Sequence, residues 1–193
     1  MKTYLIVGIL AATGLSAKTP YCGLTVRVVN NAGVSAGMFV TAAKMKAGEM
    51  FERAGVDVRM RDNVSAGKSG TACGALIVVQ IEKEDGYSGH ESALAYAMPF
   101  KNSGTTIHVF LDRVAQLGRE PGLQVALLAH VMVHEITHML QGLERHSAEG
   151  VMKARWSRDD FRHMERAALP FADEDLGLMR KGLAVLLGRG TAE

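Results

Sequence analysis

Residues 131–152 read VMVHEITHMLQGLERHSAEGVM, and this stretch decides how the chain is interpreted. It contains the pattern His-Glu-x-x-His in His134, Glu135 and His138. Because a helix turns once in about 3.6 residues, two histidines four places apart stack on one face. Two imidazoles so placed reach one zinc ion at about 2.0–2.1 Å. The glutamate, one place round the helix, reaches a water in the fourth ligand position, so the stretch predicts a zinc site with Glu135 as its general base.

The segment around this pattern is predicted to be one helix over residues 121–141. Pro121 suits the first turn of a helix, and Gly142 suits the position just past its end. The helix is apolar, so ionisable groups in the middle of its buried face need partners. Metal ligation satisfies two histidines and a glutamate together. The alternative is a pair of core or surface histidines beside a solvated glutamate.

The stretch HEITHMLQGLERHSAEGVM resembles the metzincin zinc peptidases, whose pattern is HExxHxxGxxH followed by a turn that carries a methionine beneath the metal. The run from His146 to Met152 also resembles the matrixin branch. By this resemblance one catalytic Zn²⁺ is bound by His134, His138 and His146. The resemblance also implies that Glu135 is the general base and that Met152 is the turn methionine.

The chain departs from that pattern in its spacing. Glycine comes one place late, at Gly142, and the third histidine comes two places late, at His146. The position of the family's third ligand is occupied by Glu144, which is therefore a rival ligand. A second rival is Glu165, because zinc peptidases of the gluzincin branch take a glutamate from a later helix.

The resemblance further implies a strand at the upper rim of the active site, against which an extended substrate lies antiparallel. The segment ALAYAM at 93–98 is the candidate for that strand. Its predicted substrate-binding residues are Ala93, Leu94, Ala95 and Tyr96.

Strands dominate the first half of the chain and helices the second half. This order predicts an α+β domain and not a doubly wound one. With the resemblance, the expected fold is zincin-like: a small mixed sheet, an active-site helix and C-terminal helices. Strands are expected at 24–29, 56–61, 75–82, 93–98 and 105–111, and helices at 36–54, 121–141, 158–168 and 173–187. In the first of these helices a shared face is expected for Met38, Ala42, Met45, Met50 and Phe51.

The N-terminal residues 1–17 resemble a secretory signal peptide, with one lysine, an apolar run and small residues up to Ala17. We therefore expect export to the periplasm or beyond the cell, and a single catalytic domain over residues 18–193. The alternative is a buried first strand. In an oxidising compartment Cys22 and Cys73 permit one disulfide, and the alternative is two buried thiols.

Composition excludes some classes of partner. The chain has 193 residues, of which 48% are hydrophobic and 22% charged, as in an ordinary globular protein. Its net charge of +2 gives no reason to expect nucleic acid. After removal of the signal no stable membrane span is expected, and a monomer is assumed.

Several other residues near the motif have weaker interpretations. His130 is expected to lie in the core or line a cavity, and Trp156 is expected to pack under the active-site turn. Ser147 either orients His146 through a hydrogen bond or caps the turn. Tyr87 and Tyr96 are candidates for stabilising an oxyanion.

The function predicted from these residues is a zinc metalloendopeptidase that hydrolyses peptides or proteins through a metal-activated water. One alternative is a zinc-binding interaction module without catalysis on a peptidase scaffold. Glu135 argues against it, because a purely structural site needs no base. Another alternative is a zinc amidase that acts on non-peptide or cell-wall amides.

Overall fold

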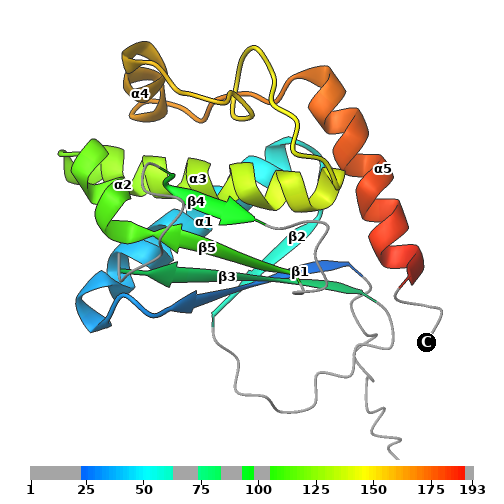
Figure 1. The fold of residues 1–193 in the computed structure, drawn as a ribbon, viewed down its shortest axis with the longest axis horizontal. Helices are drawn as coiled ribbons and strands as arrows, with labels where there is room; N and C mark the ends of the chain where they lie inside the picture. The colour runs from blue at the N-terminus through cyan, green and yellow to red at the C-terminus, as the bar shows by residue number, and fades with distance from the viewer. Residues whose placement is uncertain (1–22, 63–73, 84–92, 98–104, 190–193) are drawn as a thin grey trace, which may run out of the picture.

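The computed structural model describes residues 23–62, 74–83, 93–97 and 105–189, and Figure 1 shows how they are arranged. The order of elements matches the expected division into a strand-rich first half and a helical second half, which confirms the α+β class. In chain order the elements are β1 (Leu24–Asn30), the short 3-10 helix η1 (Val34–Ala36), α1 (Gly37–Arg53), β2 (Val58–Arg61), β3 (Ala75–Glu82), β4 (Ala95–Ala97), β5 (Thr106–Phe110), α2 (Leu111–Leu117), α3 (Pro121–Gln141), α4 (Arg158–Met164) and α5 (Asp173–Arg189).

The five strands form one mixed sheet in the order β2-β1-β3-β5-β4. Strands β2, β1, β3 and β5 run parallel, whereas β4 pairs with β5 in the antiparallel sense. Side chains alternate between the two faces of a strand. In β1 the inward set is Leu24, Val26 and Val28, none of which is more than 2% exposed. The apolar face of the sheet therefore carries the core, with β2 at one edge and β4 at the other.

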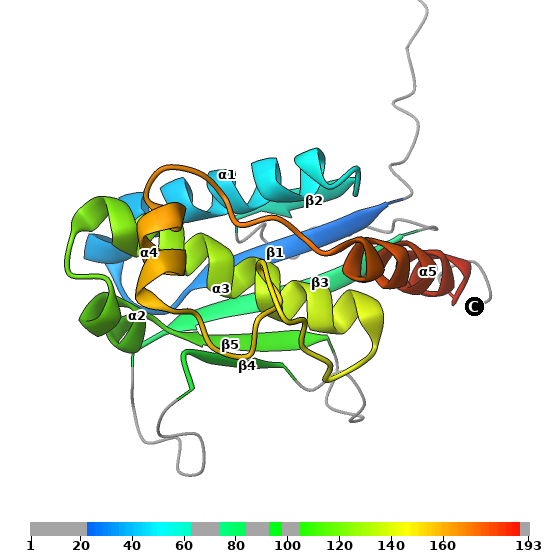
Figure 2. The ribbon, with the colours of Figure 1, turned by 90° about the horizontal axis from the view of Figure 1, so that it is seen from above.

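The helices cover that apolar face. Figures 1 and 2 show α1 and α3 side by side on one side of the sheet, with α5 at the C-terminal end of α3. From Ala126 to Leu140 every residue of α3 except Glu135 is buried. Helix α3 is long and apolar enough to cross a membrane, by length and composition alone. However, 67% of its most apolar 18-residue stretch is buried inside the protein. It is the central helix of the core and presents one polar group, Glu135, at a less buried position.

Helix α1 buries a different face from the expected one. Met38 and Met45 are 88% and 62% exposed, and Ala42 is exposed too, so the prediction that these three share the buried face of Met50 and Phe51 is wrong. The inward face instead places Val40, Ala43 and Ala47 before Met50 and Phe51, and it buries the stem of Lys44, whose ammonium group pairs with Asp62. The buried residues of α1 are Val40, Ala43, Lys44, Ala47, Met50 and Phe51.

Most other predicted elements are present with shifted ends. The strand expected at 105–111 ends at Phe110, and the chain turns at once into α2, which the sequence did not reveal. The helix expected at 158–168 ends at Met164. The predicted signal peptide, Cys22, Cys73 and Tyr87 lie outside the described residues.

Candidate metal centre

The C-terminal half of α3 carries the first two candidate ligands on one face. His134 and His138 lie one turn apart, and both are buried, at 8% and 7% exposure. Just beyond them Gly142 adopts a left-handed conformation, with φ of 62°, and its N–H donates to the carbonyl of His138. Only glycine adopts this conformation without steric strain, so the helix ends there and the chain turns back over α3.

Backbone carbonyls fix the orientation of both rings. The Nδ1 of His134 lies 2.9 Å from the carbonyl oxygen of Val151, and the Nδ1 of His138 lies 2.9 Å from that of Leu143. A carbonyl oxygen only accepts, so each Nδ1 carries the hydrogen. The Nε2 atom of each neutral ring is therefore an unprotonated lone pair. Such second contacts are what hold metal-binding histidines in position.

The two Nε2 atoms face each other at 3.0 Å. With a hydrogen on each Nδ1, neither neutral ring has an Nε2 hydrogen to donate to the other. Burial lowers the pKa of His134 to about 4 and also lowers the pKa of His138, so neither ring takes up an extra proton at neutral pH. Two facing lone pairs repel each other unless a cation lies against both. The donor set therefore fits a metal ion.

His146 completes the group from the segment after α3. Its ring centroid lies 5.2 Å from that of His134 and 5.0 Å from that of His138. One ligand atom from each ring lies within 4.8 Å of the other two. Nitrogens bound to one tetrahedral zinc at about 2.0–2.1 Å are about 3.4 Å apart, so small ring movements bring the triad to that geometry.

The rival ligands stay outside this group. Within the ranges that the structure describes, the three histidines are the one cluster able to hold a metal. Glu144 and Glu165 are both exposed and do not belong to it. The geometry therefore favours His146 over either glutamate as the third ligand.

The turn that contains Met152 lies against the first ligand. Its Val151 provides the carbonyl that accepts from His134, and the side chain of Met152 is fully buried. The N–H of Ser147 donates to the carbonyl of Met152 at 2.8 Å, which ties the two ends of the loop together. Ser147 was expected either to orient His146 or to cap the turn. Its hydroxyl instead donates to Asp175, a residue that the sequence did not single out.

Glu135 has the acid–base properties of a proton-transfer group. Burial raises the pKa of its carboxyl to about 7, while a hydrogen bond from the backbone of Ala97 acts in the opposite direction. A group with a pKa near neutrality both accepts and releases protons at neutral pH. Since Ala97 belongs to β4, the carboxyl lies between the helix and the edge strand.

The candidate rim strand lies beside the site, at the edge of the sheet. Two contacts fix its beginning: Arg113 of α2 donates from Nη1 to the carbonyl of Ala93 at 2.6 Å, and the N–H of Phe110 donates to that of Leu94 at 2.9 Å. Ala95 is buried on the face toward the core. Tyr96 stacks on His108 on the opposite face, with ring centroids 4.9 Å apart, so its hydroxyl is not placed to reach the triad.

His130 lies one turn before His134 and is a core residue. Its Nδ1 lies 2.6 Å from the carbonyl of Ala126, and its Nε2 accepts the N–H of Leu169 at 3.0 Å. Trp156 packs edge-on against both His130 and His134, with centroid distances of 6.2 Å and 5.7 Å. His130 therefore ties the segment after α4 to α3 and takes no part in the triad.

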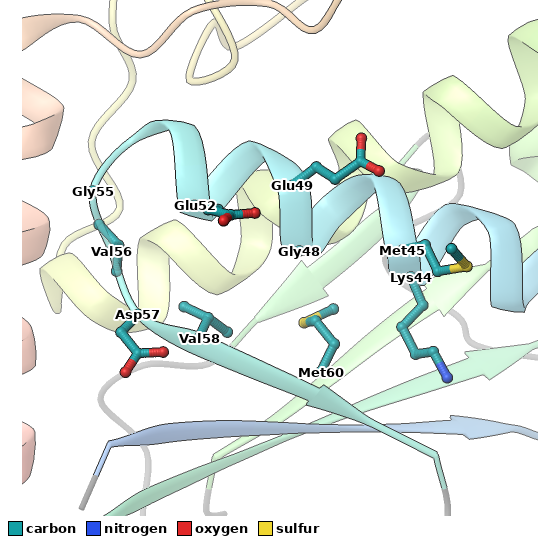
Figure 3. A pocket seen from close by; sticks show the side chains of 10 residues that line it. All are labelled: Lys44, Met45, Gly48, Glu49, Glu52, Gly55, Val56, Asp57, Val58 and Met60. Carbon is teal, nitrogen blue, oxygen red and sulfur yellow. The ribbon is translucent and has the colours of Figure 1, made fainter.

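A groove elsewhere on the molecule does not compete with this site. It lies between α1 and β2 and is lined by Glu49, Glu52, Val58 and Met60 among others (Figure 3). Strand β2 is at the opposite edge of the sheet from β4. The groove is thus remote from the triad.

Comparisons with known proteins agree on the fold. No family model matches the sequence, and no curated protein matches it either. Among solved structures, the chain is similar to a crystal structure of archaemetzincin from Methanopyrus kandleri, with a TM-score of 0.57 and 16% sequence identity over 87% of this chain and 99% of that chain. The predicted zincin-like α+β fold is confirmed, and the resemblance of the motif to the metzincins is matched by the architecture around it.

Proposed function

We propose that this archaemetzincin-like domain is a zinc-dependent metallopeptidase that binds one zinc ion through His134, His138 and His146. The observation that carries the proposal is the pair of unprotonated Nε2 atoms facing each other at 3.0 Å, with His146 beside them. Neutral imidazoles are common zinc ligands, and three of them leave a fourth position open. An open position is the mark of a catalytic site as opposed to a structural one.

Glu135 is the proposed general base. When bound, zinc supplies Lewis acidity, which polarises a carbonyl group and makes water more acidic. The carboxyl of Glu135, with its pKa near 7, accepts the proton of the attacking water and then returns it to the leaving nitrogen. A module that only binds metal has no use for this carboxyl.

The proposed substrate is an extended peptide that runs antiparallel to β4. This strand is at the edge of the sheet, and Ala97 at its end contacts Glu135. A peptide added at this edge would therefore pass the general base. Ala95 is the proposed backbone contact, because the backbone groups of alternate residues point to opposite sides of a strand and those of Leu94 point to β5. The carbonyl of Ala93 already accepts from Arg113, so Ala93 and Leu94 are proposed to contact the peptide through their side chains. Tyr96 lies opposite His108 and its ring stacks on the far face of the sheet, so it is the weakest of the four proposed contacts.

The test is a pair of isosteric substitutions assayed for zinc content and for cleavage of a peptide library. Glu135→Gln should retain one zinc per chain while peptide hydrolysis falls by about 10²–10⁴-fold. Glu144→Gln, the matched change at an exposed glutamate near the site, should keep both. Hydrolysis by Glu135→Gln at the wild-type rate would exclude the proposed role, and loss of zinc from Glu144→Gln would reassign the third ligand.

We also propose that the protein is exported and acts as a monomer with one catalytic domain over residues 18–193. The signal-like segment 1–17 in the sequence supports export, whereas the monomeric state is an assumption. Mass spectrometry of the protein recovered from the cell envelope or the medium tests the cleavage. A mass that includes residues 1–17 would contradict it.

A further inference from the structure

We propose that Asp175, in the first turn of α5, is the positioning residue for the third zinc ligand. It binds the side chains of the residues immediately before and after His146 and so fixes the loop that presents that imidazole to the metal. This inference rests on the proposed zinc site and adds to it a residue remote in sequence. It also means that the C-terminal helix α5 contributes to zinc binding.

The first observation is a difference between the three imidazoles. His134 and His138 are each locked by a carbonyl at Nδ1. His146 is exposed and stacks beside the other two imidazoles, and within the described part of the chain no hydrogen bond from a carbonyl or side chain holds its ring. Its direction must therefore be set by the backbone that carries it.

The second observation is that the side chains on both sides of His146 are bound to one buried carboxylate. Asp175 is fully buried. The hydroxyl of Ser147 donates to its Oδ2 at 2.7 Å, and Nη1 of Arg145 donates to its Oδ1 at 2.8 Å. Arg145 and Ser147 are the two neighbours of His146, so the carboxylate fixes the chain immediately before and after the ligand. Gln141, at the end of α3, adds a third donor at 3.3 Å.

The charge at Asp175 is compatible with this role. A buried carboxylate is costly unless it is paired and hydrogen-bonded, and Arg145 provides both a charge and a donor. The second nitrogen of the same guanidinium pairs with Glu174, whose side chain is 66% exposed.

Close helix packing brings Asp175 to this position. Helix α5 crosses the end of α3 at Gly182, where an added Cβ would lie 1.5 Å from the carbonyl oxygen of Leu140. One turn earlier, buried Met179 packs on Thr137, whose hydroxyl lies 3.6 Å from the sulfur. The two helices therefore touch near the C-terminal end of α3, where Figure 1 shows α5. The start of α5 is joined to the loop that carries His146 by the hydrogen bonds of Arg145 and Ser147 to Asp175.

The experiment measures zinc affinity by competition with a chelator, in wild type, Asp175→Ala, Ser147→Ala and Glu174→Ala. Asp175→Ala should weaken zinc binding by about 10- to 100-fold, as for other outer contacts of metal ligands. Ser147→Ala, which removes one hydrogen bond to the carboxylate but leaves that of Arg145, should weaken it by roughly threefold to tenfold. Glu174→Ala, the adjacent exposed carboxylate on the same arginine, should leave it within about twofold.

A double-mutant cycle separates positioning of His146 from general support of the fold. In a His146→Ala background, Asp175→Ala should cost less than about threefold in zinc affinity, because the ligand that it positions is gone. An equal cost in both backgrounds would overturn the inference. So would wild-type affinity in both Asp175→Ala and Ser147→Ala.

Two further outcomes are distinguishable. If Asp175→Ala does not fold, as judged by circular dichroism without metal, Ser147→Ala decides in its place, since loss of one hydroxyl leaves the buried ion pair intact. If the wild-type protein binds no zinc, the proposed function fails together with this inference. Zinc-binding wild type with unaffected variants rejects the inference alone.

Discussion

His130 should make the stability of the metal-free protein depend on pH. The ring is fully buried, and both of its nitrogens are used: Nδ1 donates to the carbonyl of Ala126, and Nε2 accepts from the N–H of Leu169. Protonation would place an Nε2 hydrogen against the hydrogen of Leu169. Burial accordingly lowers the pKa of His130 from 6.5 to about 4.

The sign and size of the effect follow from this shift. The unfolded chain binds the proton from about pH 6.5 downward, whereas the folded protein does so only near pH 4. Stability is therefore complete above the unfolded pKa and falls by about 1.4 kcal/mol per pH unit as the pH drops between the two values. At about pH 5 the folded state should have lost about 2 kcal/mol through His130.

The assay compares wild type with His130→Gln, an uncharged side chain that retains a donor and an acceptor. Urea unfolding is measured from about pH 8 to pH 5 in the presence of a chelator, so that the other histidines are metal-free and equal in both proteins. The variant should lose about 2 kcal/mol less than wild type over this range. Only the pH dependence is compared, since glutamine also changes packing. Parallel curves for the two proteins would show that this ring does not carry the titration.

Four other predictions concern packing, substrate and metal. Gly182→Ala should lower the free energy of unfolding by about 1–3 kcal/mol, because the added methyl group overpacks against α3. Gly177→Ala is the control, since Gly177 lies on the same helix with open space around it, and it should raise the free energy of unfolding slightly. Equal effects of the two changes in urea unfolding would contradict the close contact. Arg113→Met should raise KM for extended peptides more than it lowers kcat, because Arg113 holds the start of the rim strand; a pure kcat effect in steady-state kinetics would count against this. Chelation of zinc should lower the melting temperature, which should recover on adding zinc back. Deletion of Glu144 should weaken zinc binding far more than Glu144→Ala, and equal affinities by chelator competition would show that loop length is unimportant.

The sequence predicted the central helix because its signals are local. Pro121 and Gly142 mark the two ends, and the interior is apolar enough to require burial. The alternating pattern of β1 and the apolar run of β3 were equally local. These elements depend on backbone chemistry and side-chain periodicity within a few residues, so they need no knowledge of the rest of the fold.

Features that depend on tertiary contacts were not predictable in the same way. Packing against α3 decides which face of α1 is buried. Met38 and Met45 therefore face solvent in spite of their apolar character. Asp175 gave no signal, because an acidic residue at the start of a helix is also what the helix dipole favours. The choice between His146 and Glu144 depends on the path of a loop, which spacing alone does not determine.

That path also explains how a loop longer than the metzincin pattern is compatible with a metal site. After Gly142 the chain uses the carbonyl of Leu143 to lock His138, so the residues added before the third histidine are in contact with the second. Arg145 then reaches the buried carboxylate of Asp175, which offsets the freedom that a longer loop would otherwise have. A free loop would lose conformational entropy on metal binding, whereas an anchored one has already lost it on folding. The longer loop before the third histidine and its anchor on Asp175 of α5 therefore belong together. A related chain with an equally long loop should require a comparable anchor to bind zinc.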